Sequence, residues 1–99
     1  MSDGHARHRL EDVLVHPVRL SIVAALVRVD EAEFGTVRDA VEVSDSVLSR
    51  QVATLVGAGL VSTRKGYVGL RPRTWLKLTS HGRVSYARHL EALREIAGD

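Results

Sequence analysis

The stretch from Ser44 to Leu60 limits the possible folds most strongly, because it predicts a helix with both ends marked. The hydroxyl of Ser44 can accept a hydrogen bond from a free amide of the first helical turn. Gly59 suits the left-handed residue that ends many helices. Three apolar residues lie at helical spacing on one stripe, Leu48, Val52 and Leu55. The sequence therefore predicts a helix that packs through this stripe.

The other face of this helix is predicted to be small, hydroxylated and basic. Its polar members are Ser46, Ser49, Arg50 and Thr54. Such a face fits a DNA major groove, where small side chains let the backbone approach and Arg50 can donate two hydrogen bonds to guanine. It equally fits an ordinary solvated helix surface, so the helix alone leaves both interpretations open.

Basic residues are concentrated in the middle of the chain, although the formal net charge is only +2. Residues 44–83 hold seven lysines and arginines against Asp45 alone, and no acid lies between residues 46 and 90. Residues 1–43 hold five arginines against eight acids. An anionic partner is therefore expected to bind the middle of the chain and not its ends.

The residues before Ser44 predict two further helices. The first begins at Pro17, which is favourable at the first helical position, and runs to about Arg28. After an acidic connector, Phe34–Thr36 forms either a short strand or the start of the next helix. Thr36 is expected to cap that helix, which covers about Val37–Val41. A short helix, a tight turn and a Ser-capped helix give the helix-turn-helix layout.

After Gly59 the pattern changes to that of strands. Leu60–Lys65 and Thr74–Leu78 are rich in β-branched or large apolar residues and predict two strands joined by a loop over Gly66–Arg73. The basic residues of this hairpin can bind phosphates or reach into a minor groove, and they are Arg64, Lys65, Arg71 and Arg73. A charged hairpin tip is also ordinary soluble surface, but the missing acids favour a nucleic-acid contact.

A last helix is predicted over residues 80–97, capped by Thr79. Its apolar band is wide for so small a domain, and part of it would be exposed in a monomer. The short segment Leu10–Val15 is also half apolar. We therefore expect a two-fold dimer with an interface formed by Leu10, Val13, Leu14, Tyr86, Leu90, Leu93 and Ala97.

Residues 1–9 are polar and are expected to form a flexible tail, leaving residues 10–99 as one domain. His5 and His8 in this tail can share a metal, but two histidines in such a tail are usually solvated. No metal or cofactor is therefore predicted. His81 and His89 are expected at the surface or the interface. The absence of cysteine excludes disulfides and thiolate zinc sites. No signal sequence or membrane-length apolar run is found, which predicts a cytoplasmic protein.

Three segments resemble the ArsR- and MarR-like winged-helix regulators. His16–Ile22 resembles their first-helix signature, and Leu48–Val61 resembles their recognition helix and the turn after it. Arg71–Arg83 resembles the wing, third strand and last-helix start of a short subgroup. The resemblance implies an α+β, mostly α, winged helix-turn-helix with a two-stranded wing hairpin and a C-terminal dimerisation helix.

The same resemblance implies a homodimer that binds a pseudo-palindromic operator in double-stranded DNA and usually represses transcription. Half-sites are then expected about one turn apart, ~10 bp. Many ArsR-type sensors use cysteines, and full-length MarR proteins carry extra dimerisation helices; this chain has neither, so no small-molecule effector is implied. The chain carries no nucleophile elbow, phosphate-binding glycine loop or paired carboxylates, so an enzyme is not expected. The alternative is a winged-helix module that binds protein and no DNA.

Overall fold

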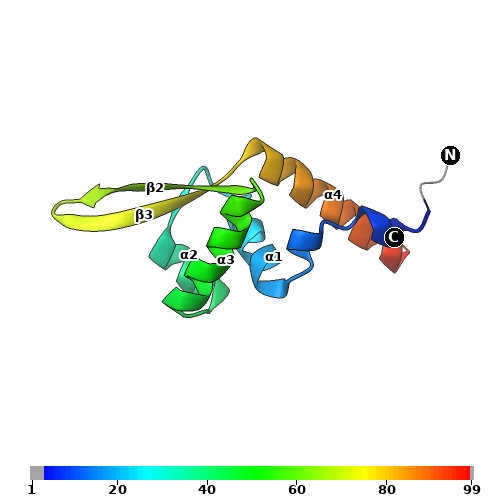
Figure 1. The fold of residues 1–99 in the computed structure, drawn as a ribbon, viewed down its shortest axis with the longest axis horizontal. Helices are drawn as coiled ribbons and strands as arrows, with labels where there is room; N and C mark the ends of the chain where they lie inside the picture. The colour runs from blue at the N-terminus through cyan, green and yellow to red at the C-terminus, as the bar shows by residue number, and fades with distance from the viewer. Residues whose placement is uncertain (1–3, 99) are drawn as a thin grey trace.

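The computed structural model describes residues 4–98, which form four α-helices and a three-stranded antiparallel sheet (Figure 1). The helices are α1 (Pro17–Leu26), α2 (Phe34–Val41), α3 (Asp45–Gly57) and α4 (Ser80–Ala97). The strands are β1 (Ala32–Glu33), β2 (Val61–Val68) and β3 (Arg71–Leu78), in the order β1-β3-β2. Two short 3-10 turns precede α1, η1 (Ala6–Arg9) and η2 (Asp12–Leu14). The predicted α+β, mostly helical architecture is confirmed.

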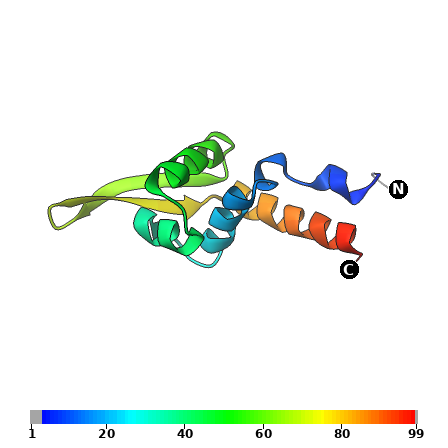
Figure 2. The ribbon, with the colours of Figure 1, turned by 90° about the horizontal axis from the view of Figure 1, so that it is seen from below.

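The molecule is elongated, with extents of 57 × 24 × 21 Å. The β2–β3 hairpin projects from one end, and α4 with both described chain ends lies at the other (Figure 1). In the view from below, α3 and α2 lie on either side of the hairpin's base (Figure 2). None of the helices in residues 4–98 is long and apolar enough to cross a membrane.

Helix α3 forms as the sequence predicted. The Ser44 hydroxyl accepts a hydrogen bond from the Val47 amide at 3.2 Å, and Asp45 stands in the first turn. Gly59 has a φ of +79°, as its role after the helix requires. The predicted stripe is buried in a core made chiefly of Leu14, Ile22, Leu26, Leu48, Leu55 and Leu76. This packing leaves the other face of α3 toward solvent.

Helix α1 begins at the predicted residue but ends at Leu26, about two residues early. His16 caps it through Nδ1, which accepts from the Val18 amide. Arg19 then donates to the Val13 carbonyl at 2.7 Å and to the Gln51 side chain at 2.9 Å, so it ties η2 to α1 and α3. As a result Leu14 of η2 is fully buried inside the chain. Its placement in a dimer interface was therefore wrong.

The hairpin is longer than predicted. The two strands pair continuously, from Val61 with Leu78 at the base to Val68 with Arg71 near the tip. Only Gly69 and Leu70 remain to form the turn. The predicted loop over Gly66–Arg73 was wrong, because cross-strand pairing continues through it. Gly66 stays in the strand with the Trp75 ring across it, where an added Cβ would lie 3.1 Å from a ring carbon. Glycine in a strand often marks such a close approach.

The start of α2 also differs from the prediction. The chain forms β1 at Ala32–Glu33, where these residues pair with Leu76 and Trp75, and α2 starts at Phe34. Thr36 therefore lies inside the helix and is not its cap. The sequence could not show this, because a two-residue strand is defined by its partner and not by its own pattern.

Helix α4 has the predicted bounds and cap, since the Thr79 hydroxyl accepts from the Gly82 amide at 2.9 Å. Its buried residues are, however, Gly82, Ser85, His89 and Ala92. His89 is only 1% exposed, and its Nδ1 accepts from the Glu11 amide at 3.1 Å. The prediction of a surface or interface position for His89 was wrong, because the chain before α1 covers it.

Residues 1–9 were predicted to form a flexible tail, and the structure differs from this prediction in the second part of the segment. Residues 1–3 lie outside the described residues, whereas Ala6–Arg9 form η1 against α4. A salt bridge of 2.7 Å joins Arg9 to Glu95. The Nδ1 atom of His5 accepts from the Arg7 amide, so this nitrogen already caps the turn.

Burial of His89 makes the folded state sensitive to acid. Burial lowers the pKa of His89 below the ordinary 6.5, although the nearby Glu11 acts in the opposite direction. As pH falls below 6.5, His89 is protonated in the unfolded chain before it is protonated in the folded chain. The free energy of unfolding therefore decreases as pH falls through the pKa of the folded state. We expect the free energy of unfolding to fall between pH 7.5 and 5.5 in denaturant titrations. His89→Gln should flatten this dependence and His81→Gln, at an exposed position, should keep it; equal slopes for all three proteins would contradict the account.

Candidate nucleic-acid interface

The outward face of α3 carries one cation, Arg50, whose guanidinium is available to a ligand. Ser46, Ser49, Arg50 and Thr54 are all exposed. The Thr54 hydroxyl donates to the Arg50 carbonyl at 3.3 Å, which leaves the Arg50 guanidinium untouched. Within residues 4–98 this guanidinium has no hydrogen-bond or ion-pair partner, so all its donors can meet a ligand. Arginine is suited to paired acceptors such as the O6 and N7 atoms of guanine.

The hairpin divides its basic residues between its two faces. Directly paired residues share a face and successive residues alternate. Arg64 faces Trp75, Gly66 faces Arg73 and Val68 faces Arg71, so the three arginines lie on one face. Lys65 lies on the other, with Tyr67. The structure therefore brings three of the four predicted wing cations together and separates the fourth.

Two of these arginines are held by acids from the segment before α2. Arg64 donates to Glu31 at 2.6 Å and stacks over the Trp75 ring, with its guanidinium carbon 4.2 Å from the ring centroid. Arg73 forms an ion pair of 2.5 Å with Glu33. The hydrogen bond from Arg64 lowers the pKa of Glu31, so this acid stays ionised.

The sequence had placed these acids in a connector without assigning them partners. Glu31 and Glu33 are two residues apart, and β1 pairing turns both toward the arginine face of the hairpin. Lys65 and Arg71, by contrast, have no acid within ion-pair distance in the described part of the chain. Of the four predicted wing cations, two are thus available and two are neutralised internally.

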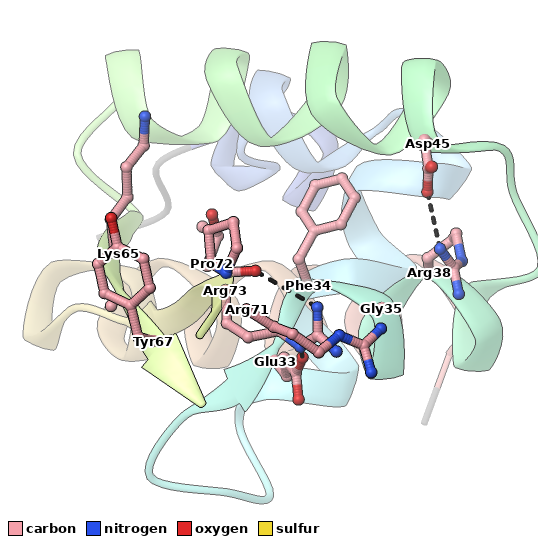
Figure 3. A pocket seen from close by; sticks show the side chains of 12 residues that line it. Glu33, Phe34, Gly35, Arg38, Asp45, Lys65, Tyr67, Arg71, Pro72 and Arg73 are labelled. Atoms are coloured by element: carbon pink, nitrogen blue, oxygen red, sulfur yellow. Dashed lines mark hydrogen bonds and ion pairs between the residues drawn. The ribbon is translucent and has the colours of Figure 1, made fainter. Parts of the chain in front are cut away.

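A cleft of about 660 Å³ lies between the hairpin and the N-terminal ends of α2 and α3. Lys65 and Tyr67 lie at one end, Phe34 and Arg73 in the middle, and Arg38 and Asp45 at the other end (Figure 3). Arg38 donates to Asp45 and to Asp39, each at 2.9 Å. Sequence reasoning missed Phe34 and Arg38, because only the fold brings α2 beside the wing.

A second surface carries apolar side chains on α4. Leu93, Ile96 and Ala97 are exposed near the end of α4, Val84 is exposed near its start, and Tyr86 and Leu90 are half-buried. Val15 of the N-terminal segment is exposed as well, whereas Leu10 and Val13 are half-buried. We call the set formed by Tyr86, Leu90, Leu93, Ile96 and Ala97 the α4 patch. Among the described residues, no cluster of three metal-ligating side chains occurs.

Comparison with known proteins gives a family for this arrangement. The family described as "Winged helix DNA-binding domain" matches residues 18–97. The transcriptional regulator homologue of Pyrococcus horikoshii OT3 has a similar structure, with a TM-score of 0.81 and 29% identity over 87% of this chain and 85% of that chain.

Two further solved structures are similar. The transcriptional repressor BigR of Xylella fastidiosa is 30% identical over 85% of this chain and 78% of that chain, with a TM-score of 0.67. A MarR-family transcriptional regulator of Silicibacter pomeroyi is 27% identical over 91% of this chain, also with a TM-score of 0.67. This chain covers 60% of that longer protein.

Proposed function

The chain belongs to the winged helix DNA-binding domain family, and we propose that it represses transcription as a homodimer bound to an operator in double-stranded DNA. The membership confirms the winged-helix resemblance drawn from the sequence, including its likeness to MarR-family regulators. The observation that carries the proposal is the exposed, acid-free face of α3 with Arg50 at its centre, whose guanidinium has no partner among residues 4–98.

In the proposed complex α3 lies in the major groove. Arg50 reads a guanine, and the hydroxyl groups of Ser46, Ser49 and Thr54 contact base edges or phosphates. Lys65 and Arg71 hold phosphates directly. Arg64 and Arg73 contribute less than the sequence suggested, because each must first leave an acid.

The proposed dimer forms through the α4 patch. Leu93, Ile96 and Ala97 of this patch are exposed, and Tyr86 and Leu90 are half-buried. Helix α4 lies at the end of the molecule away from the hairpin, so pairing two copies there leaves both α3 helices and both wings free (Figure 1). A two-fold pair implies a pseudo-palindrome with half-sites about one turn apart, ~10 bp. A dimer on such a site would repress by covering promoter DNA, and the similar protein BigR is described as a transcriptional repressor.

The test of DNA binding is a titration of labelled 30-bp random duplex by fluorescence anisotropy at several salt concentrations. A DNA-binding protein should bind at low salt and weaken by about 0.9 units of log–log slope for each neutralised phosphate. The alternative, a winged-helix module that binds only protein, requires no binding even at the lowest salt. That result would end the proposal.

The acids on the wing give a further prediction. Glu31→Gln combined with Glu33→Gln frees the guanidinium groups of Arg64 and Arg73, so both can bind phosphates. We expect the salt slope for random duplex to steepen by about two units and low-salt affinity to rise on the order of tenfold. The control is Asp30→Asn with Glu42→Gln, which changes net charge equally at exposed acids that form no ion pair among the described residues. Equal gains in both variants would show a general charge effect and contradict the specific one.

A further inference from the structure

The tip of the hairpin is apolar, which phosphate binding alone does not require. Tyr67 is 73% exposed, Val68 55% and Leu70 96%. Gly69 makes the turn with a φ of +63°, and Leu70 follows at its outermost position. The tip lies at the far end of the molecule from α4 (Figure 1). Large exposed apolar side chains gathered in this way indicate a binding surface.

The surroundings of the tip indicate the class of partner. Arg71 is adjacent to Leu70, Lys65 lies on the same hairpin, and both are without an acidic partner in residues 4–98. No acid occurs from residue 46 to residue 90. A partner must therefore offer negative charge beside an apolar surface. The minor groove of duplex DNA does so, since phosphates line its rims, deoxyribose carbons form its walls, and the stacked faces of the base pairs are apolar.

We propose that Leu70 enters the minor groove beside the site held by α3 and wedges between two base pairs, while Arg71 binds a phosphate at the rim. This inference rests on the proposed DNA binding and adds a second mode of recognition to it. Apolar wedges of this kind unstack one step and bend the duplex toward the major groove. An eight-residue strand spans about 26 Å, which is enough to cross from one groove over the intervening backbone.

The wedge predicts a sequence preference that Arg50 does not supply. Pyrimidine–purine steps such as TA and CA unstack most easily, so one of them is expected at a fixed distance outside each half-site. The protein would read this step through its deformability, with no hydrogen bond to its base edges. Replacing TA by AA there should weaken binding even though no polar group reads the change.

The experiment uses a duplex selected by the full chain from a random-sequence pool. Adenines flanking the half-sites are replaced in turn by 2-aminopurine, whose fluorescence rises when it is unstacked. We expect one bright position outside each half-site. Leu70→Ser should abolish the signal and weaken binding at least fivefold, and should fold normally because Leu70 is almost wholly exposed. Val84→Ser, at an exposed apolar residue of α4, is the matched control and should keep the signal.

The possible failures can be told apart. A bound duplex without any bright position, and with equal affinity for Leu70→Ser, would overturn the wedge but leave the proposed function standing. If no duplex is selected or bound, both the wedge and the proposed DNA binding are contradicted. If Leu70→Ser instead converts a dimer to a monomer in sedimentation velocity, the tip contacts a second copy of the chain, and the wedge is overturned.

Discussion

Replacing Arg50 by alanine is expected to weaken binding to the selected duplex by about 5- to 150-fold, which corresponds to the ~1–3 kcal/mol of one bidentate base contact. Binding to random duplex should change little, because Arg50 is assigned to a base and not to a phosphate. The expectation follows from its exposed guanidinium on the outward face of α3, which has no partner in the part of the chain that the structure describes. Arg50→Lys should recover little, because a lysine cannot form the paired contact. Parallel anisotropy titrations of both duplexes measure the effect.

The control is Arg88→Ala, which removes the same charge from an exposed site on α4. It should leave both affinities close to those of the unchanged chain. An equal loss on selected and random duplex for Arg50→Ala would assign this side chain to the phosphate backbone and contradict its role in base recognition.

The second large effect is on stability. Gly82→Ala should lower the free energy of unfolding by about 1–3 kcal/mol, the usual effect of forcing extra volume into a packed site. An added Cβ would overlap the carbonyl oxygen of Leu60 and lie 2.6 Å from a methyl carbon of Leu78. The carbonyl belongs to the backbone and cannot rotate away, so α4 must move. This penalty outweighs the helix propensity of alanine, which would otherwise add about 1 kcal/mol.

Gly57→Ala provides the matched comparison. Gly57 also lies in a helix, but apart from its own helical turn and its chain neighbours no atom of the described residues would lie within 4 Å of an added Cβ. This variant should therefore gain up to ~1 kcal/mol from helix propensity. Denaturant titrations of both variants decide the matter. A gain in stability for both would show that α4 has room beside Leu60 and would contradict the packing described.

The features that sequence predicted are those with local causes. The cap at Ser44, the stripe of α3 and the stop at Gly59 depend on neighbours within one or two turns, and all three are confirmed. The same holds for Thr79 and the bounds of α4. The exposed α3 face also followed from periodicity, since the position of one stripe fixes the other face.

The features that sequence missed depend on partners far along the chain. The hairpin extends through Gly66 because Trp75 lies across it, and no pattern within residues 66–73 signals that contact. Glu31 lies beside Arg64 and neutralises it only because β1 pairs with β3. His89 is buried because the segment before α1 lies along α4, which periodicity within α4 could not reveal.

The central claim is that two copies of α3, joined through α4, read two half-sites of one duplex. A hydroxyl-radical footprint of the full chain on its selected duplex tests this most directly. The account predicts two protected stretches on each strand, related by two-fold symmetry and centred ~10 bp apart. A single protected stretch without symmetry, or uniform cleavage under conditions where the protein is bound, would contradict it.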